Sequence, residues 1–254
     1  MIRRSLKQCV IEFREFEMFS EIKAPYKVPC IIRCDGRNFH RLTEEMKFSK
    51  PYDIKFMDIM VKSAKRVFVE GFNPVFAYVF SDEINFLFLD LPFNRRIEKV
   101  DSVIASIVSS SFSLYLLERI GVKRVVSFDA RIIPIPYDII IEYFIWRQAE
   151  CWRNHINSYA FYSLLKLGYS RREAAQKLKG LKKDDLHDLT FKIAKINLAR
   201  TPLWQRRGVL IHYITVKKNR IKREQGCEIS YIRRILVENW NLPLFSSDVG
   251  RMFL

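Results

Sequence analysis

Short apolar runs and helical spacings alternate along the first half of the chain. Strands are expected over residues 27–33, 75–80, 84–89 and 125–135, each a short apolar run beside turn-forming residues. Helices are expected over 53–70 and 94–118, where apolar side chains return at helical spacing. Gly71 to Pro74 ends the first helix, and Ser81 to Glu83 is the turn of a hairpin. This β-α-β-β-α-β order is typical of a ferredoxin-like antiparallel sheet.

The second half of the chain has a mostly helical pattern. Helices are expected over 137–165, interrupted or bent around the polar stretch 147–157, and over 184–195. A third helix, 171–178, carries Ser170 and Glu173 in capping-box positions. Residues 208–218 look like a strand that runs into a basic segment. We therefore predict an α+β fold, with residues 1–136 as a catalytic domain and 137–254 as a mostly helical, basic region that completes the fold.

Charge indicates a polyanionic partner. The chain has 44 Lys and Arg against 28 Asp and Glu, a net charge of +16. Residues 166–235 hold 19 basic and 6 acidic side chains, a local excess of +13. Nucleic acid is the commonest partner of such a surface. The alternatives are a merely soluble basic protein and a thermophilic surface rich in ion pairs, although ion pairs would raise both signs together.

The five cysteines predict a reducing compartment. No C-x-x-C pair occurs, the number is odd, and no secretory segment precedes Ile11. We expect free thiols, a cytoplasmic location and no membrane partner, because no apolar run approaches the length that spans a bilayer.

Two acids stand where the predicted sheet brings its first strand beside the hairpin turn. Asp35 ends the first strand and Asp82 lies in the turn, followed by Glu83. Neighbouring carboxylates disfavour each other's ionisation, and divalent cations such as Mg²⁺ remove that cost. Gly36 allows close backbone approach, and residues 37–41 offer N–H groups and cations to a triphosphate. The alternative is that Asp-Gly and Ser-Asp-Glu are merely turns.

Six ordered motifs resemble the tRNA-histidine guanylyltransferase family over residues 28–157, and more loosely over 180–210. They are I-I-R-C-D-G-R-N-F-H-R-L (31–42), F-S-K-P-Y-D (48–53), A-Y-V-F-S-D-E-I-N-F-L-F (77–88), N-R-R-I-E-K (94–99), F-D-A-R (128–131) and W-R-Q-A-E-C (146–151). The resemblance implies a polymerase-like palm that adds nucleotides in the 3′→5′ direction. ATP activates the tRNA 5′-monophosphate, and the 3′-hydroxyl of GTP or another NTP then attacks and releases AMP. It also implies two Mg²⁺ ions and a homo-tetramer.

The resemblance assigns roles to individual residues. Asp35 and Asp82 would be the metal carboxylates, with the Gly36 carbonyl as a further ligand and Glu83 in support. The expected nucleotide contacts are Arg37, Asn38, Phe39, His40, Lys50, Asp53 and Ser81. Arg33, Arg96 and Lys99 would assist 5′ activation or hold a second triphosphate. The expected tRNA contacts, some from the resemblance and some from charge and polarity, are Arg131, Arg147, Gln148, Asn154, Arg206, Arg207, Lys217 and Lys218.

Departures from the eukaryotic motifs narrow the expectation. Ala130 replaces the usual glycine of F-D-G-R, Phe80 replaces the glutamine before Ser-Asp-Glu, and W-R-N-H-I-N-S-Y (152–159) replaces H-I-N-N-L-Y. This pattern is similar to archaeal and bacterial guanylyltransferase-like proteins, which favour template-directed addition and repair of 5′-truncated tRNA. Two other interpretations stay open: another palm protein, such as a nucleotide cyclase or conventional polymerase, and a non-catalytic tRNA-binding protein that kept the fold.

Overall fold

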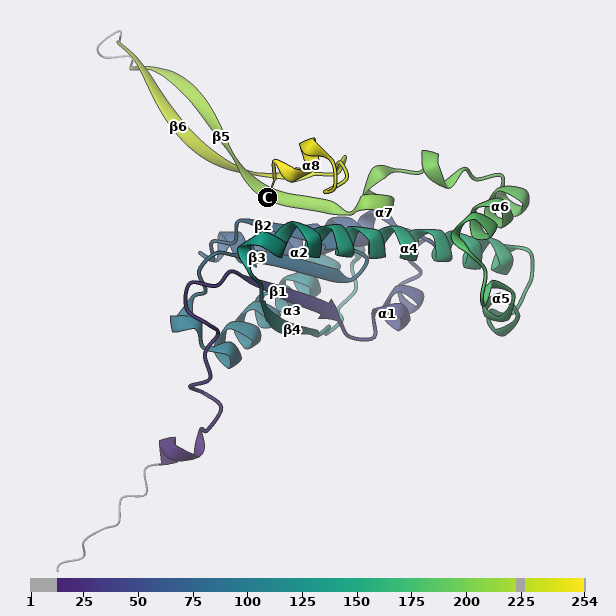
Figure 1. Cartoon of the computed structure of the whole chain (residues 1–254), viewed down its shortest axis with the longest axis horizontal. Coiled ribbons are helices and arrows are strands. Elements are labelled where there is room, and N and C mark those ends of the chain that lie inside the picture. The colour runs from purple at the N-terminus through teal and green to yellow at the C-terminus, as the bar shows by residue number, and fades with distance from the viewer. Residues whose placement is uncertain (1–12, 223–226, 254) are drawn as a thin grey trace, which may run out of the picture.

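A six-stranded antiparallel sheet organises the part of the chain that the computed structural model describes, residues 13–222 and 227–253. Its order is β4-β1-β3-β2-β5-β6 (Figure 1). The strands are β1 (Cys30–Gly36), β2 (Phe76–Phe80), β3 (Glu83–Phe88), β4 (Phe128–Pro134), β5 (Val209–Lys222) and β6 (Cys227–Asn239). The first four follow the predicted β-α-β-β-α-β order, and the sequence pattern did not predict β6.

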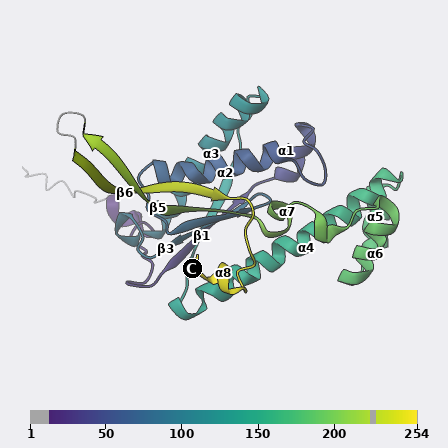
Figure 2. The same ribbon diagram turned by 90° about the horizontal axis from the view of Figure 1, so that it is seen from above.

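Helices cover both faces of the sheet. Helices α2 (Ile54–Val69) and α3 (Ile97–Ile120) pack on one face, and α4 (Ile140–Lys166) runs along the other (Figure 2). Successive side chains of a strand point to opposite faces. Ile32 and Cys34 of β1 accordingly join the core under α2 and α3, whereas Ile31 joins the core under α4.

Helix α3 corrects the prediction that no segment has the length and composition of a membrane span. Ile97–Ile120 is long and apolar enough by that measure. Here it packs on the sheet through Val100, Ile104 and Phe112, which are all fully buried. Its serines lie against the neighbouring chain: Phe128 N donates to Ser109 Oγ at 3.0 Å. These serines therefore allow α3 to pack closely against the chain that leads into β4.

The region after β4 differs from its prediction in two ways. Helix α4 is continuous from Ile140 to Lys166, so the expected interruption at residues 147–157 is wrong. The region is also less helical than predicted, because β5 and β6 form a long hairpin. The capping box of α5 is confirmed, since Glu173 N donates to Ser170 Oγ and Ser170 N donates to the Glu173 carboxylate. The shorter helices are α1 (Phe39–Glu45), α5 (Arg171–Leu178), α6 (Lys183–Ala194), α7 (Leu203–Arg207) and α8 (Asp248–Arg251), with 3-10 turns η1 (Phe13–Phe16), η2 (Phe93–Arg95), η3 (Tyr137–Ile139) and η4 (Leu198–Arg200).

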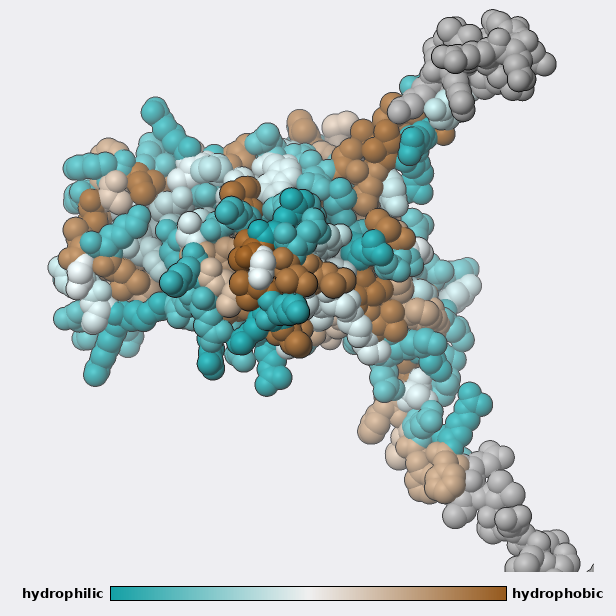
Figure 3. Space-filling model, turned by 180° about the vertical axis from the view of Figure 1, so that it is seen from behind, coloured by the Kyte–Doolittle hydropathy of each residue, from teal (hydrophilic) through white to brown (hydrophobic). Residues whose placement is uncertain are grey.

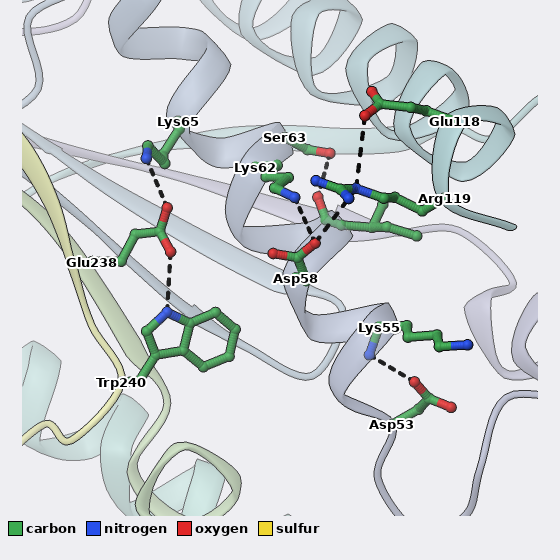
Figure 4. Close-up of polar contacts among 11 residues, drawn as sticks. Asp53, Lys55, Asp58, Lys62, Ser63, Lys65, Glu118, Arg119, Glu238 and Trp240 are labelled. Carbon is green, nitrogen blue, oxygen red and sulfur yellow. Dashed lines mark hydrogen bonds and ion pairs between the residues drawn. The ribbon is translucent and has the colours of Figure 1, made fainter.

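The β5–β6 hairpin begins inside the sheet and then projects from the body (Figure 1). Residues Val209 to His212 pair with β2, which places this part of the C-terminal region within the sheet of the predicted catalytic domain. Lys65 Nζ of α2 donates to Glu238 of β6 at 2.7 Å, and Trp240 Nε1 donates to the same carboxylate at 3.0 Å (Figure 4). The base of the hairpin is therefore tied to both the sheet and α2.

Candidate active site

The ladder between β1 and β3 brings acidic residues together where β1 ends and β3 begins, in the interior of the sheet. Asp35 pairs with Glu83 in this antiparallel ladder, and Asp82 is the residue immediately before β3. Gly36 N donates to the Asp82 carbonyl at 3.1 Å, which closes the turn against the end of β1. The strand order predicted from the sequence thus gives the proximity expected for Asp35 and Asp82.

Asp82 is in an environment that disfavours its charge. Burial raises the pKa of Asp82, and the nearby carboxylates of Asp35 and Glu83 raise it further. The Ser81 hydroxyl opposes this by donating to Asp82 Oδ1 at 2.9 Å. Among residues 13–217 and 230–253, whose side chains the structure describes, no basic side chain forms an ion pair with Asp35 or Asp82. A divalent cation would supply the missing positive charge.

The two acids fit a metal that takes most of its ligands from a substrate. In the part of the chain that the structure describes, no cluster of three or more His, Cys, Asp or Glu side chains is arranged to hold an ion. Mg²⁺ commonly binds one or two carboxylates and completes its octahedron with waters and phosphate oxygens. Asp35, Asp82 and the carbonyl of Gly36 therefore suit Mg²⁺ with a bound triphosphate better than a metal held by protein groups alone.

Glu83 is engaged elsewhere, and this differs from its expected place beside the metal. Arg147 of α4 donates to both Glu83 oxygens, from Nε at 2.9 Å and from Nη2 at 2.7 Å. Asn85 Nδ2 donates to Glu83 Oε1 at 2.7 Å, and Tyr143 O–H donates to Asn85 Oδ1 at 2.7 Å. Glu83 and Arg147 form a buried, bidentate pair that fixes α4 on the sheet beneath the site.

Arg147 and Gln148 were expected to contact tRNA, and their burial corrects that expectation. The Gln148 amide donates to the carbonyls of Arg207 and Pro243 at 3.2 and 3.1 Å. Its oxygen accepts from Phe245 N at 2.9 Å. These side chains fasten α4 to the chain around it, so neither is available to a ligand at the surface.

A cavity of about 230 Å³ opens beside Asp82. Ser81, His40 and Lys50 line it, as expected for nucleotide contacts. Lys50 is half-buried, and burial lowers its pKa. Its ammonium donates to Thr43 Oγ1 at 2.5 Å. The cavity thus places a cationic side chain within the same space as the Asp82 carboxylate.

Two other expected nucleotide contacts have structural tasks at the cavity wall. Asp53 caps α2: its carboxylate accepts from Lys55 N at 2.7 Å, drawn in Figure 4, and from Ser49 N at 2.8 Å. Phe39 is buried against Phe112 and Phe128. Its ring lies so close to Gly36 that an added Cβ would meet Phe39 Cδ2 at 2.5 Å. Glycine is therefore required at residue 36 by packing.

Several expected residues lie away from this cavity. Arg37 and Asn38 are exposed and line a separate hollow with Arg124. Arg96 and Lys99 lie at the start of α3. Further along the same helix, Ser109 and Ser113 contact Phe128 and Val126, and Phe128 pairs with Gly36. A helix rises 1.5 Å per residue, so its start is on the order of 20 Å from this contact. Within one chain, Arg96 and Lys99 are therefore remote from Asp35.

The remaining basic residues that were expected to contact tRNA or its 5′ end differ in how exposed they are. Arg33 and Arg131 pair across β1 and β4, one row along the sheet from Asp35, and Arg131 Nη2 donates to Asp129 at 2.6 Å. Arg206 and Arg207 are half-buried and donate to the carbonyls of Thr201 and Leu242. Lys217 is exposed on β5, whereas the side chain of Lys218 lies outside the described part of the structure.

The structure adds cavity residues that sequence reasoning missed. Tyr52, Ser158, Tyr162, Trp204 and Gln205 line the cavity together with Asn154, which was predicted to contact tRNA. Asn154, Ser158 and Tyr162 are spaced by four residues and so share one face of α4. That spacing was visible in the predicted helix, whereas nothing in the sequence brought Trp204 or Gln205 to this place.

These features define a class of protein. An unneutralised carboxylate pair, a lysine in an adjoining cavity and an antiparallel sheet that presents both are the parts needed for metal-assisted phosphoryl or nucleotidyl transfer. The family profile described as tRNAHis guanylyltransferase matches residues 11–136, and that described as Thg1 C terminal domain matches residues 138–234. The chain belongs to the tRNA(His) guanylyltransferase family and is a nucleotidyltransferase.

Individual relatives agree with this assignment. The chain is 32% identical to the tRNA(His) guanylyltransferase of Debaryomyces hansenii, over 84% of this chain and 86% of that protein. It is 33% identical to a probable tRNA(His) guanylyltransferase of Mus musculus, over 75% of this chain and 66% of that protein. Among solved structures it resembles a bacterial tRNA(His) guanylyltransferase-like protein in complex with ATP, with a TM-score of 0.74, 26% identity and coverage of 95% and 96% of the two chains.

Proposed function

We propose that the protein activates the 5′ end of a tRNA with ATP and then adds a nucleotide there, notably from GTP, under the direction of a template. The observation that carries the proposal is the Asp35–Asp82 pair beside the Lys50 cavity. Bacterial relatives of similar fold have been solved with ATP and with GTP, which supports a triphosphate in this cavity. The task would be repair of truncated tRNA or maturation of tRNA-His in the cytoplasm.

The proposed chemistry has two balanced steps. A 5′-phosphate oxygen of the tRNA attacks the α-phosphorus of ATP, which forms a 5′-adenylylated end and releases pyrophosphate. The 3′-hydroxyl of the incoming NTP then attacks the 5′-phosphorus, which forms a phosphodiester and releases AMP. Two Mg²⁺ ions held by Asp35, Asp82 and the Gly36 carbonyl would offset the charge of the attacking and leaving oxygens when bound.

The chain's own groups would position the reactants. Lys50 supplies positive charge for the triphosphate inside the cavity, where a low dielectric strengthens the attraction. Ser81 orients Asp82 through the hydrogen bond between their side chains. Arg147 neutralises Glu83, so the repulsion that the bound metal relieves is mainly that between Asp35 and Asp82.

In this proposal the sheet carries the catalytic site and the basic region contacts the tRNA. The β4-β1-β3-β2 part of the sheet acts as a polymerase-like palm of ferredoxin-like type, built from residues 1–136. Residues 137–254 complete the fold and contribute tRNA contacts, with Lys217, Lys218, Arg206 and Arg207 as candidates. Arg33 and Arg131, next to Asp35 on the same face, would meet the 5′ end, whereas Arg96 and Lys99 would serve a site only if another copy brought them there. We propose a homo-tetramer as the assembly.

The test is nucleotide addition to a defined tRNA. The protein is incubated with Mg²⁺, ATP, GTP and a 5′-monophosphorylated tRNA that lacks its first nucleotide, and the 5′ end is mapped. We expect adenylylation followed by extension, both abolished in Asp35→Asn and Asp82→Asn and retained in Asp138→Asn, an exposed acid outside the site. If the wild-type protein neither adenylylates nor extends the tRNA, the proposed function is wrong.

A further inference from the structure

Trp146 of α4 is a large aromatic side chain to which the proposed chemistry gives no role. It is 52% exposed, although α4 packs on the sheet through neighbouring residues. Exposed apolar side chains are common on this protein, as Figure 3 shows for one face, and a single one needs no explanation of its own. The contacts and the location of Trp146 must therefore decide whether it has a role.

Arg147 holds the Trp146 ring on one face. Its guanidinium carbon lies 4.3 Å from the ring centroid, where the electrons of the indole attract a cation. The same guanidinium binds both oxygens of Glu83, and Glu83 is the partner of Asp35 in the ladder between β1 and β3. Because Arg147 covers one face and 52% of Trp146 stays exposed, the opposite face of the ring is open to a ligand beside the catalytic carboxylates.

Tyr143 holds the same ring at its edge. The centroids of the two rings are 5.6 Å apart and their planes meet at 71°, while Tyr143 O–H donates to Asn85 Oδ1 of β3 at 2.7 Å. Burial raises the pKa of Tyr143 to about 12, and the nearby Arg33 guanidinium opposes that rise. Arg33 is in turn the partner of Arg131 across β1 and β4. The Trp146 ring is therefore fixed before any ligand arrives, and its Tyr143 support adjoins this basic pair.

An open aromatic face beside two arginines suits a nucleobase. RNA-binding proteins hold bases on aromatic rings and phosphates on nearby cations, because every base has a π-face. Arg33 and Arg131 are the pair proposed above to meet the 5′ end of the tRNA. The triphosphate is proposed to occupy the cavity beside Asp82, and Trp146 is not among the residues that line that cavity. A base on Trp146 would therefore belong to the other reactant, the tRNA.

We infer that Trp146 stacks on the 5′-terminal base of the tRNA and so holds the reacting end over Arg33 and Arg131. The inference rests on the proposed function and deepens it, because it adds a contact to a base where the other expected contacts are to phosphate. A ring that is already rigid loses little conformational freedom when the base arrives. Stacking also tolerates any base, so the contact suits an enzyme that accepts tRNAs with different 5′ nucleotides.

Equilibrium binding of a 5′-monophosphorylated tRNA that lacks its first nucleotide tests the inference. Filter binding of this tRNA is compared for the wild-type protein and three substitutions of Trp146. Trp146→Ala should raise the dissociation constant about 5- to 140-fold, the range expected for loss of one base–aromatic stack. Trp146→Phe keeps a stacking ring and should recover most of the loss, whereas Trp146→Leu keeps only apolar bulk and should not. The control is Phe191→Ala on α6, an aromatic residue of similar exposure at 54%, which should bind as the wild type does.

A tRNA with an abasic 5′-terminal nucleotide separates stacking from a structural effect of the substitution. The wild-type protein should bind this tRNA as weakly as Trp146→Ala binds the intact one, and Trp146→Ala should lose nothing further. The wild-type protein alone supplies the first comparison, so an unstable variant does not remove the test. Salt dependence of binding should be the same for Trp146→Ala and wild type, because a stacked base releases no counterions. A shallower slope would mean that the phosphate-binding arginines had moved, and the inference would then be wrong.

Two other results would overturn the inference. One is equal affinity of the wild-type protein for the intact and abasic tRNAs. The other is a loss in Trp146→Ala that appears in the binding of ATP and not in the binding of tRNA. Binding requires no turnover, so a wild-type protein that fails to extend the tRNA would contradict the proposed function while this test could still be carried out.

Discussion

The buried pair between Arg147 and Glu83 is the clearest place to separate a structural role from tRNA contact. We consider Arg147→Met, which keeps the aliphatic bulk of the side chain and removes its charge. In the native protein the two side chains are 8% and 11% exposed. The substitution leaves the Glu83 carboxylate buried with Asn85 Nδ2 as its remaining side-chain donor among the described residues.

The expected cost is large because the remaining charge is desolvated. Removing one partner of a buried ion pair typically destabilises a protein by about 3–5 kcal/mol, whereas replacing both charges is often close to neutral. We expect Arg147→Met to lie in that range. Glu83→Gln/Arg147→Met should recover most of it, because a glutamine oxygen can still accept from Asn85.

Urea denaturation of the metal-free protein measures these differences in the free energy of unfolding. The matched control is Arg153→Met, which breaks an exposed pair with Glu150 on the same helix and should cost about 0–1 kcal/mol. A loss of tRNA affinity by Arg147→Met without loss of stability would refute our reasoning and restore the tRNA contact expected from the sequence. A double variant no more stable than Arg147→Met would also refute it.

Three further predictions concern the metal site, its backbone and the RNA surface. Asp82→Asn should raise the melting temperature in EDTA at neutral pH, because the raised folded pKa of Asp82 means that its ionisation opposes folding there. The gain should begin to shrink as pH falls through the folded pKa and disappear below the ordinary carboxyl pKa of the unfolded chain, so a gain independent of pH would contradict the burial argument. Gly36→Ala should lower the free energy of unfolding by about 1–3 kcal/mol in urea denaturation, because the added Cβ would overlap the Phe39 ring. The comparison is Gly71→Ala, where an added Cβ would meet no neighbouring atom and the strain comes from the positive φ of residue 71 alone. Affinity for tRNA, measured by filter binding, should fall steeply as salt rises because phosphate contacts release counterions, and a flat response would remove the role given to the basic C-terminal region.

Sequence reasoning worked best where burial leaves a simple pattern of apolar residues. The apolar periodicity of α2 follows from packing on one side, and α2 lies where it was predicted. The apolar run that predicted a strand over residues 27–33 follows from burial on both faces, and β1 lies three residues later, at Cys30–Gly36. The order of these elements then placed Asp35 beside Asp82, because a sheet of this connectivity leaves few alternatives.

Prediction failed where buried polar groups satisfy one another. Arg147, Gln148 and His155 made the middle of α4 look solvated, but each is buried with polar partners. A periodicity argument assigns polar side chains to water and has no way to see a partner far along the chain. Strand β6 was missed for a related reason: exposed Tyr231 and Ile232 stand beside exposed arginines, so no clean inside and outside marks the strand.

The pairing of β5 with β2 has a consequence for how the protein is made. Phe76 to Phe80 form a fully buried strand, and one of its edges is covered only when Val209 to His212 arrive from much later in the chain. Until the ribosome has released that segment, the growing polypeptide exposes an apolar strand edge next to the turn that bears Asp82, and such edges promote aggregation. A fragment ending near residue 136 should therefore precipitate or require a chaperone, and the catalytic turn should gain its final shape late in folding.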